Sequence, residues 1–424
     1  MSLLPRGSLP RAAAVLAACC LLVVPSNWRA SPSALGGEWP QILGPHRSGA
    51  ADQEKLANKW PADGPKVAWR HKVGAGYAGP AVATSKVVIF HRLANEEVLE
   101  ALDAASGRQL WEARFPTRYE SAIAPDDGPR CVPLIHNGRV IAVGAAGTVH
   151  CVQLASGEAL WSRDVYKDFD APQGYFGAGS TPVAEGERVL MNVGGKQAGL
   201  AAFALADGKP LWKVAGEQAS YSSPTLATID GARHAIFVTR FNVVSVDPAS
   251  GKERFRFAFG QRGPTVNAAT PLVLFDRRLF VSASYGIGAV FSEIGKQGIK
   301  ELWASDEIMS SQYTTCVFHG DHLYGIHGRQ DAGPAVLRCI EPRQGKVLWS
   351  EEGFGTGHLI LADDKLVIVK TDGEVVLANA STEKFERLAT ARMFQATTQA
   401  LPALADGHLV ARDTTTLKSI ELKR

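Results

Sequence analysis

The stretch Ala101-Leu102-Asp103-Ala104-Ala105-Ser106-Gly107-Arg108-Gln109-Leu110-Trp111 decides the fold of this chain, because imperfect copies of it return along most of the sequence. The copies follow the pattern A-x-D-x-x-S/T-G-x-x-x-W and lie about 40 to 50 residues apart. Their recurring large residues are Trp69, Trp111, Trp161, Trp212, Phe255, Trp303 and Trp349, and a last loose copy ends at Leu388. A period of this size indicates a repeat architecture.

Each repeat is predicted to contain four short strands. Alternating apolar runs such as Lys86–Phe90 and Arg139–Val143 precede the phrase and are typical of strands. Within the phrase, Asp103 can accept hydrogen bonds from backbone amides in a turn, and Gly107 can adopt a positive φ. The tryptophan then begins the next strand, where we expect its ring to fill the gap between neighbouring sheets. Repeated four-stranded units of this length predict an all-β propeller.

The number of blades is predicted to be eight. Eight segments open in a similar way, near Pro80, Pro133, Pro182, Pro224, Pro271, Cys316, Leu359 and Pro402. The last segment, Leu401–Leu422, has room for about three strands, whereas the strand-like segment Lys66–Val73 has no blade of its own. We therefore expect Lys66–Val73 to be the outer strand of the last blade. This pairing would close the ring and leave fewer exposed sheet edges.

Over residues 66–424 the repeats resemble those of the PQQ-like, or quinoprotein-type, β-propeller family. The resemblance rests on the repeated phrase, and the segment Glu38–Gly49 also resembles the start of secreted bacterial members. One branch of the family contains non-catalytic outer-membrane-assembly lipoproteins of the BamB type. The other contains dehydrogenases that use PQQ with calcium and typically carry adjacent cysteines over the cofactor. The adjacent pair in this sequence, Cys19-Cys20, lies in an apparent signal segment.

The resemblance therefore implies a non-catalytic binding or assembly scaffold without a cofactor or metal. A PQQ-dependent oxidoreductase is the alternative, and a glycan-binding propeller of the cell envelope is a second alternative.

The N-terminal region predicts export. Arg6 and Arg11 precede the apolar run Ala12–Val24, which is too short for a membrane span and typical of a signal peptide. A lipobox-like sequence ends at Cys19, but the apolar run continues beyond it, so lipid attachment stays open. We expect a signal in residues 1–30, an irregular extension in residues 31–65 and the propeller in residues 66–424. The predicted location is the periplasm or cell envelope.

Composition is typical of a globular protein, and we expect a monomer. Hydrophobic residues make up 46% and charged residues 21%, and the formal net charge is +3. This small charge gives no electrostatic reason to expect nucleic-acid binding. The repeat register places Cys131, Cys151, Cys316 and Cys339 too far apart for disulfides, so buried free thiols are expected.

Two local patterns are interpreted as structural. The sequence Gly74–Gly79 spells G-x-G-x-x-G, but a strand is predicted after it where a dinucleotide site needs a helix. His319, His322 and His327 are interpreted as surface or edge histidines, because residues five apart on a strand point to opposite faces.

One face of the ring is predicted to bind a ligand. In an up-and-down blade, the loop before strand one and the loop between strands two and three lie at the same end. These loops carry Tyr77, Arg130, Tyr175, Phe176, Tyr221, Arg240, Asn267, Tyr285, Tyr313, Arg329 and Gln330. Tyrosine and arginine suit recognition, and arginine can hold a carboxylate or phosphate, although the tyrosines could instead pack the blade junctions. The expected partner is an envelope protein, a peptide or a glycan.

Overall fold

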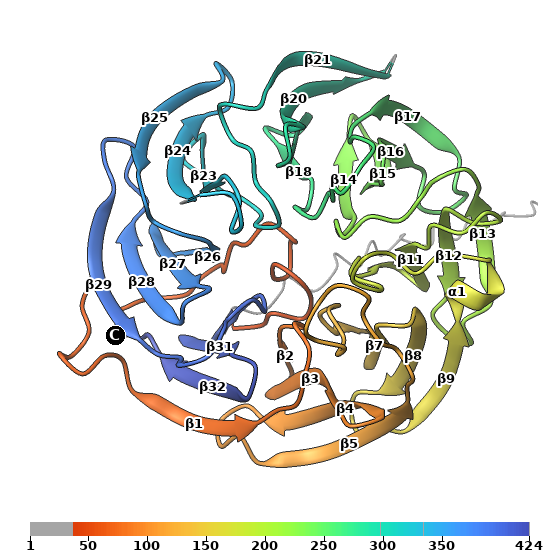
Figure 1. Cartoon of the computed structure of the whole chain (residues 1–424), viewed down its shortest axis with the longest axis horizontal. Helices are drawn as coiled ribbons and strands as arrows, with labels where there is room; N and C mark the ends of the chain where they lie inside the picture. The colour runs from red at the N-terminus through yellow and green to blue at the C-terminus, as the bar shows by residue number, and fades with distance from the viewer. Residues whose placement is uncertain (1–36, 297, 334, 424) are drawn as a thin grey trace, which may run out of the picture. The chain divides into compact units, whose positions relative to one another are not determined.

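The computed structural model describes residues 37–296, 298–333 and 335–423. The predicted signal segment, including Cys19, therefore lies outside the described residues. Eight sheets form a ring, and each contains four antiparallel strands, as the repeats predicted (Figure 1). We number the blades 1 to 8 in the order in which their first strands occur. The first strand of each blade lies nearest the centre of the ring and the fourth lies at its rim (Figure 1).

The first four blades comprise β2 (Ala81–Ala83), β3 (Lys86–Leu93), β4 (Glu96–Asp103) and β5 (Gln109–Pro116); β6 (Leu134–His136), β7 (Arg139–Val143), β8 (Thr148–Gln153) and β9 (Ala159–Asp164); β10 (Val183–Glu185), β11 (Arg188–Asn192), β12 (Leu200–Ala204) and β13 (Pro210–Val214); β14 (Thr225–Ile229), β15 (Ala232–Val238), β16 (Asn242–Val246) and β17 (Glu253–Ala258). A short helix, α1 (Val165–Asp168), follows β9.

The other four blades comprise β18 (Leu272–Leu274), β19 (Arg278–Ala283), β20 (Gly288–Gly295) and β21 (Gly298–Ser305); β22 (Val317–His319), β23 (His322–His327), β24 (Val336–Glu341) and β25 (Lys346–Glu351); β26 (Gly357–Ala362), β27 (Lys365–Lys370), β28 (Glu374–Asn379) and β29 (Glu386–Arg392); β30 (Ala403–Ala405), β31 (His408–Arg412) and β32 (Thr416–Glu421), with β1 (Val67–Lys72) as the fourth strand of blade 8.

The ring is closed by the N-terminal strand, which confirms the prediction for Lys66–Val73. Strand β1 pairs antiparallel with β32, and the pairs include Trp69 with Ser419 and His71 with Leu417. Blade 8 thus combines strands from the two ends of the propeller sequence. Within the described residues, no helix is long and apolar enough to cross a bilayer.

The repeated phrase forms a turn that receives the tryptophan of the preceding blade. In blade 1, Asp103 Oδ1 accepts hydrogen bonds from the Ser106 amide at 2.9 Å and from the Ser106 hydroxyl at 2.6 Å. Gly107 has a φ of +70°, and a Cβ atom there would lie 2.6 Å from the ring of Trp69, which belongs to blade 8. The glycine therefore supplies both the positive φ and the space for the ring.

The same junction recurs at six places around the ring, because six tryptophans of the repeated phrase each donate the Nε1 hydrogen to a carbonyl in the next blade. The bonds run from Trp69 to Ala104, Trp111 to Leu154, Trp161 to Leu205, Trp212 to Pro248, Trp303 to Pro342 and Trp349 to Ser381, at 2.7–3.0 Å. The predicted role of these rings between sheets is confirmed, with a specific hydrogen bond added. In blade 4 the corresponding position is Phe255, which has no such donor. In blade 7 the register places Ala389 there, because Ala389 pairs with Leu377 as Trp111 pairs with Ala101. Leu388, where the last loose copy of the phrase was expected to end, is the bulged residue just before it.

Residues 37–57 form a segment that we call the axial strap, which crosses the centre of the ring (Figure 1). The sequence predicted only an irregular extension here. Backbone hydrogen bonds join the strap to blades 1, 2, 7 and 8. They link Trp39 with Val82, Ile135 with Pro40, Ala51 with Leu361, Leu361 with Gly49 and Ala57 with Leu422. Several of these partners lie near the turns between first and second strands, so most of the strap covers that end of the axis.

Arg47 fixes the middle of the strap to blade 3. Its side chain is 3% exposed and donates to the carbonyl oxygens of Pro182 at 2.9 Å and Thr181 at 3.0 Å. A further hydrogen bond to Gln41 Oε1 holds the strap to itself. Burial lowers the pKa of Arg47 to about 9, which still leaves the guanidinium charged at neutral pH.

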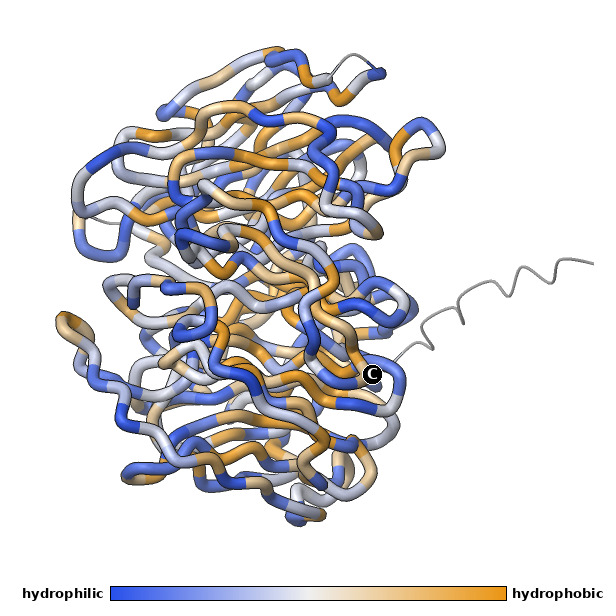
Figure 2. Tube along the Cα trace, turned by 90° about the vertical axis from the view of Figure 1, so that its right-hand side faces the viewer, coloured by the Kyte–Doolittle hydropathy of each residue, from blue (hydrophilic) through white to orange (hydrophobic). Residues whose placement is uncertain are grey.

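The core lies between neighbouring sheets as a series of apolar layers. Figure 2 shows hydrophobic residues along the strand interiors and many hydrophilic residues in the outer turns. Cys131, Cys151, Cys316 and Cys339 are buried free thiols, as predicted from the repeat register. Burial raises the pKa of Cys131 and of Cys316 to about 12, so both are protonated thiols at neutral pH.

Candidate functional site

One end of the ring carries the loops before each first strand and the loops between each second and third strand. We call this end the mouth face. A cavity of about 890 Å³ opens there, and we call it the mouth cavity. Its walls come from the linkers before blades 2, 3, 5 and 6 and from the β19–β20 and β23–β24 loops. A rigid ring thus positions several loops around one cavity, as is common for binding sites.

One wall of the mouth cavity is aromatic. Tyr175 and Phe176, from the linker between blades 2 and 3, have ring centroids 6.5 Å apart and an interplanar angle of 62°. Tyr221 supports them, because its hydroxyl accepts a hydrogen bond from the Phe176 amide at 2.8 Å and its ring lies 5.5 Å from that of Phe176. The Tyr175 side chain is nevertheless 44% exposed, so it presents aromatic surface to solvent at the cavity.

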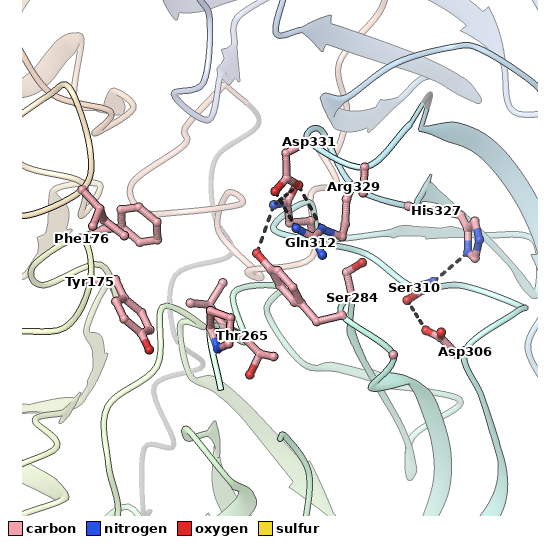
Figure 3. Close-up of a pocket in the computed structure, with 17 residues that line it drawn as sticks. Tyr175, Phe176, Thr265, Ser284, Asp306, Ser310, Gln312, His327, Arg329 and Asp331 are labelled. Carbon is pink, nitrogen blue, oxygen red and sulfur yellow. Dashed lines mark hydrogen bonds and ion pairs between the residues drawn. The ribbon is translucent and has the colours of Figure 1, made fainter. Parts of the chain in front are cut away.

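The wall across the cavity is a polar network, as Figure 3 shows. The Arg329 guanidinium binds both carboxylate oxygens of Asp331, at 3.0 and 2.5 Å. Gln312 Nε2 donates to Asp331 at 3.3 Å and to the Tyr285 hydroxyl at 3.1 Å, and Arg329 lies 4.4 Å above the Tyr285 ring. The ion pair lowers the pKa of Asp331 and balances the charge of Arg329 within the network.

A third group in the mouth cavity contains Asp306, Ser310 and His327 (Figure 3). The Ser310 hydroxyl donates to Asp306 Oδ1 at 2.6 Å, whereas the Ser310 amide donates to His327 Nδ1 at 3.0 Å. Because Nδ1 accepts a hydrogen bond, the neutral ring carries its hydrogen on Nε2. Burial, together with the nearby Arg338, lowers the pKa of His327 to about 4. The histidine bonds the serine amide rather than the hydroxyl, so it does not activate a nucleophile.

A smaller cavity of about 360 Å³ adjoins the mouth cavity and shares Tyr175 and Thr265 with it. Arg240 lines this cavity and donates to the carbonyl of Gly263 at 2.6 Å and to the Thr265 hydroxyl at 2.8 Å. Asn267 is fully buried, and its Nδ2 donates to the Thr239 carbonyl at 2.8 Å. The sequence predicted both side chains on a binding face. Both line this smaller cavity, and their hydrogen bonds also hold the linker between blades 4 and 5.

Four candidate residues lie outside the lining of both cavities, namely Tyr77, Arg130, Tyr313 and Gln330. Arg130 donates to the carbonyls of Gly128 and Asp126 at 2.6 and 2.7 Å, and it lies 5.7 Å from the centre of the Tyr77 ring. These bonds use part of its donor capacity to hold its own loop.

Tyr313 donates its hydroxyl hydrogen to Gln330 Oε1 at 2.7 Å, and burial raises its pKa. Of the predicted set, the structure brings Tyr175, Phe176, Tyr285 and Arg329 together in the mouth cavity.

Sequence reasoning missed much of the polar lining. Gln312 and Asp331 directly neighbour the predicted Tyr313 and Gln330. Their mutual hydrogen bond links the linker before blade 6 with the β23–β24 loop of the same blade, and no local motif specifies it. His327 was interpreted as a surface or edge histidine, yet it lines the mouth cavity. The sequence could have indicated this position, because His327 ends the second strand of its blade, and the loops after second strands are expected on the same face as the other candidate residues.

The lining residues do not match the needs of PQQ and calcium. PQQ is a tricarboxylate, and calcium prefers six or more oxygen ligands, including carboxylates. Among the described residues, the arginine of the mouth cavity is Arg329, and its guanidinium is already held by Asp331. No group of three His, Cys, Asp or Glu side chains in the described part of the chain could hold a metal ion.

Comparison with known proteins connects the sequence to one family. The profile described as outer membrane protein assembly factor BamB matches residues 61–167 and 94–333, which together span 61–333. A search of curated protein sequences gave no match.

Solved structures share the fold at low sequence identity. A europium-containing methanol dehydrogenase is 11% identical, with a TM-score of 0.68 and coverage of 89% of this chain and 90% of that chain. BamB from Moraxella catarrhalis is 11% identical, with a TM-score of 0.61 and coverage of 84% and 99%. Quinohemoprotein alcohol dehydrogenase from Comamonas testosteroni is 13% identical, with a TM-score of 0.64 and coverage of 90% and 80%. At these identities the likeness shows a common fold alone.

Proposed function

The chain belongs to the family of outer membrane protein assembly factor BamB, and from this premise we propose that it is an exported, non-catalytic binding protein of the bacterial cell envelope. Its partner would dock on the mouth face. The observation that carries this proposal is the mouth cavity, whose walls come from loops of several blades around one opening. The strap covers the other end of the axis, so a ligand would approach from the mouth face.

The contacts inside the cavity support binding rather than a reaction. Arg329, Asp331, Gln312 and Tyr285 bind one another, which keeps these side chains in place before a partner arrives. Such preorganisation lowers the entropy cost of association. Tyr175 remains exposed beside this network, and exposed tyrosine surface is typical of recognition sites.

Affinity capture from envelope extracts tests the proposal. The immobilised protein should retain a partner that mass spectrometry identifies and that binds again after purification. The double variant Tyr175→Ala with Arg329→Ala should lose this partner, because it removes an exposed ring and the cation of the opposite wall. Leu211→Ala is the matched control, since Leu211 is 50% exposed on β13 and lies outside both cavities. Both proteins should melt close to the wild type. Undiminished capture by the double variant would contradict the proposed binding face.

The oxidoreductase alternative has its own test. The protein is reconstituted with PQQ and calcium and is assayed with alcohols and sugars against an artificial electron acceptor. We expect no quinone-dependent reduction of the acceptor, because the cavity offers neither a free arginine fork nor a calcium ligand set among the described residues. Specific turnover that depends on added PQQ would overturn the non-catalytic assignment.

A further inference from the structure

We propose that the mouth cavity binds an uncharged, hydroxyl-rich chain, that is, a neutral oligosaccharide. This inference rests on the proposed binding function and names the chemical class of its ligand. It follows from three properties of the cavity: its arginine is already paired with a carboxylate, its aromatic rings are accessible, and its polar atoms can both donate and accept hydrogen bonds.

The arginines at the two cavities are not arranged to capture an anion. The Arg329 fork is occupied by Asp331 in a two-bond ion pair. Arg240 directs its donors to oxygen atoms of Gly263 and Thr265 in the neighbouring linker. A carboxylate or phosphate ligand would have to displace one of these partners, which reduces the gain from binding.

In the third polar group of the cavity, the imidazole of His327 is uncharged. His327 accepts a hydrogen bond at Nδ1 from the Ser310 amide, which leaves Nε2 as the donor atom. Burial keeps its pKa near 4, so it carries no charge at neutral pH. A fixed donor of this kind suits a hydroxyl oxygen of a ligand.

The aromatic wall offers flat surface for the apolar faces of sugar rings. Tyr175 is substantially exposed, and Phe176 meets it at a steep angle, so the two rings form adjoining surfaces. Tyrosine combines such surface with a polar hydroxyl. Sugar rings likewise have C–H-rich faces and a hydroxyl-bearing edge, so this wall and a carbohydrate are complementary.

The opposite wall supplies hydrogen-bond partners of both kinds. The Tyr285 hydroxyl accepts from Gln312, so its own hydrogen is left to donate. Asp331 has carboxylate lone pairs that can accept in addition to its bonds to Arg329. Within the described residues, no hydrogen bond uses the Tyr175 hydroxyl or His327 Nε2. A hydroxyl group both donates and accepts, and thus matches such a mixed set.

The size of the cavity suits a short oligosaccharide. Its volume of about 890 Å³ lies near the upper end of the roughly 300–1,000 Å³ range of small-molecule pockets. This is enough for a few sugar rings, which could be the end or an exposed stretch of a longer polymer.

Calorimetric titration of the full chain with cellotetraose, maltotetraose and chitotetraose tests the inference. At least one of these uncharged probes should bind, with an affinity that changes little with salt concentration. Tyr175→Ala should weaken binding at least tenfold, and Tyr285→Phe should weaken it severalfold because it removes only the hydroxyl. The control Leu211→Ala should bind as the wild type does.

Three results would overturn the inference: no binding of any of the probes at millimolar concentration, equal binding by Tyr175→Ala, or stronger binding of an anionic chain such as oligogalacturonate. The outcome is separable from that of the proposed function. If the mouth variants lose a captured envelope protein while the wild type binds no oligosaccharide, the protein-binding function stands and the carbohydrate inference fails. If oligosaccharides bind and no protein is captured, the carbohydrate inference stands and the ligand of the mouth face is a glycan rather than a protein.

Discussion

At the scale of single residues, six of the eight blades have a tryptophan whose side chain packs against the next blade and donates a hydrogen bond to it. Trp111 is largely buried, and its Nε1 hydrogen bond to Leu154 ties blade 1 to blade 2. Its replacement therefore removes packing and a hydrogen bond at the same junction.

Trp111→Ala should destabilise the protein by about 3–5 kcal/mol, as for other buried aromatic residues. The urea midpoint of unfolding would measure this loss. The control is Leu110→Ala, because Leu110 is adjacent in sequence but exposed, and it should shift the midpoint little. Equal midpoints for Trp111→Ala and the wild type would show that the ring is not packed between blades.

The glycine that faces the ring makes a complementary prediction. A Cβ at Gly157 would lie 2.5 Å from the Trp111 ring, and the residue has a φ of +76°. Gly138 has a similar φ of +70° but has open space around the added atom. Gly157→Ala should thus be the more destabilising substitution, by about 1–3 kcal/mol of overpacking, in thermal or urea unfolding. Equal losses in the two variants would mean that backbone strain alone explains the glycine.

Glu100 makes a prediction about pH. Burial alone would raise the pKa of this carboxyl, but hydrogen bonds from His71 and His91 outweigh burial and lower the pKa to about 2. A folded-state pKa below the ordinary value of 4.5 stabilises the folded state above that pH.

The contribution should be lost as pH falls from about 4.5 towards 2. Unfolding curves at several pH values would show a steeper acid dependence for the wild type than for Glu100→Gln. Glu120→Gln, at an exposed position, should keep the wild-type slope. A slope unchanged in Glu100→Gln would refute the assignment.

At the scale of elements, the axial strap is held to blade 3 by one buried arginine. Arg47 donates to two backbone carbonyls of blade 3 and is buried without an acidic partner among the described residues. Arg47→Met would keep much of the side-chain volume but leave the Thr181 and Pro182 carbonyls without this donor.

We expect Arg47→Met to lower the free energy of unfolding by about 1–3 kcal/mol, the cost of leaving buried polar groups unsatisfied. The exposed Arg108→Met serves as the control and should be nearly neutral. Limited proteolysis of residues 37–57 should also be faster in Arg47→Met. If neither stability nor cleavage changes, the guanidinium does not hold the strap.

The strands and their order could be predicted from sequence, whereas the strap and most of the cavity could not. The phrase ending at Trp111 contains its own turn chemistry, and the apolar alternation of neighbouring segments marks strands within a few residues. The contacts of Arg47 join residues about 135 positions apart, and no local pattern specifies them. Likewise, the order of strands and loops within a blade placed Tyr175 and Arg329 on one face. It could not show that Asp331 binds the Arg329 guanidinium.

At the scale of the whole molecule, the count of blades and the closing strand were predictable because each repeat needs a neighbour to bury its apolar face. Although the blades are similar, the contacts that join neighbouring blades differ around the ring. Six junctions have a tryptophan hydrogen bond, whereas the junctions after blades 4 and 7 have Phe255 and Ala389 at that position. Beside the latter, the strap binds both blade 7 and blade 8.

The junction between blades 4 and 5 has neither form of support, since none of the strap hydrogen bonds described above reaches these blades. A cavity of about 370 Å³ lies between them, lined in part by His234, Phe255 and Ile294. We therefore expect local opening of the ring to occur most readily at this junction. Native-state hydrogen exchange should accordingly give the lowest opening free energies for amides in β14–β21. Uniform protection across all blades would contradict this.

The linker between the same two blades contributes Thr265 to the mouth cavity, so a bound ligand should slow exchange here more than in blades 7 and 8. Affinity at the mouth would then depend on how often this one junction opens.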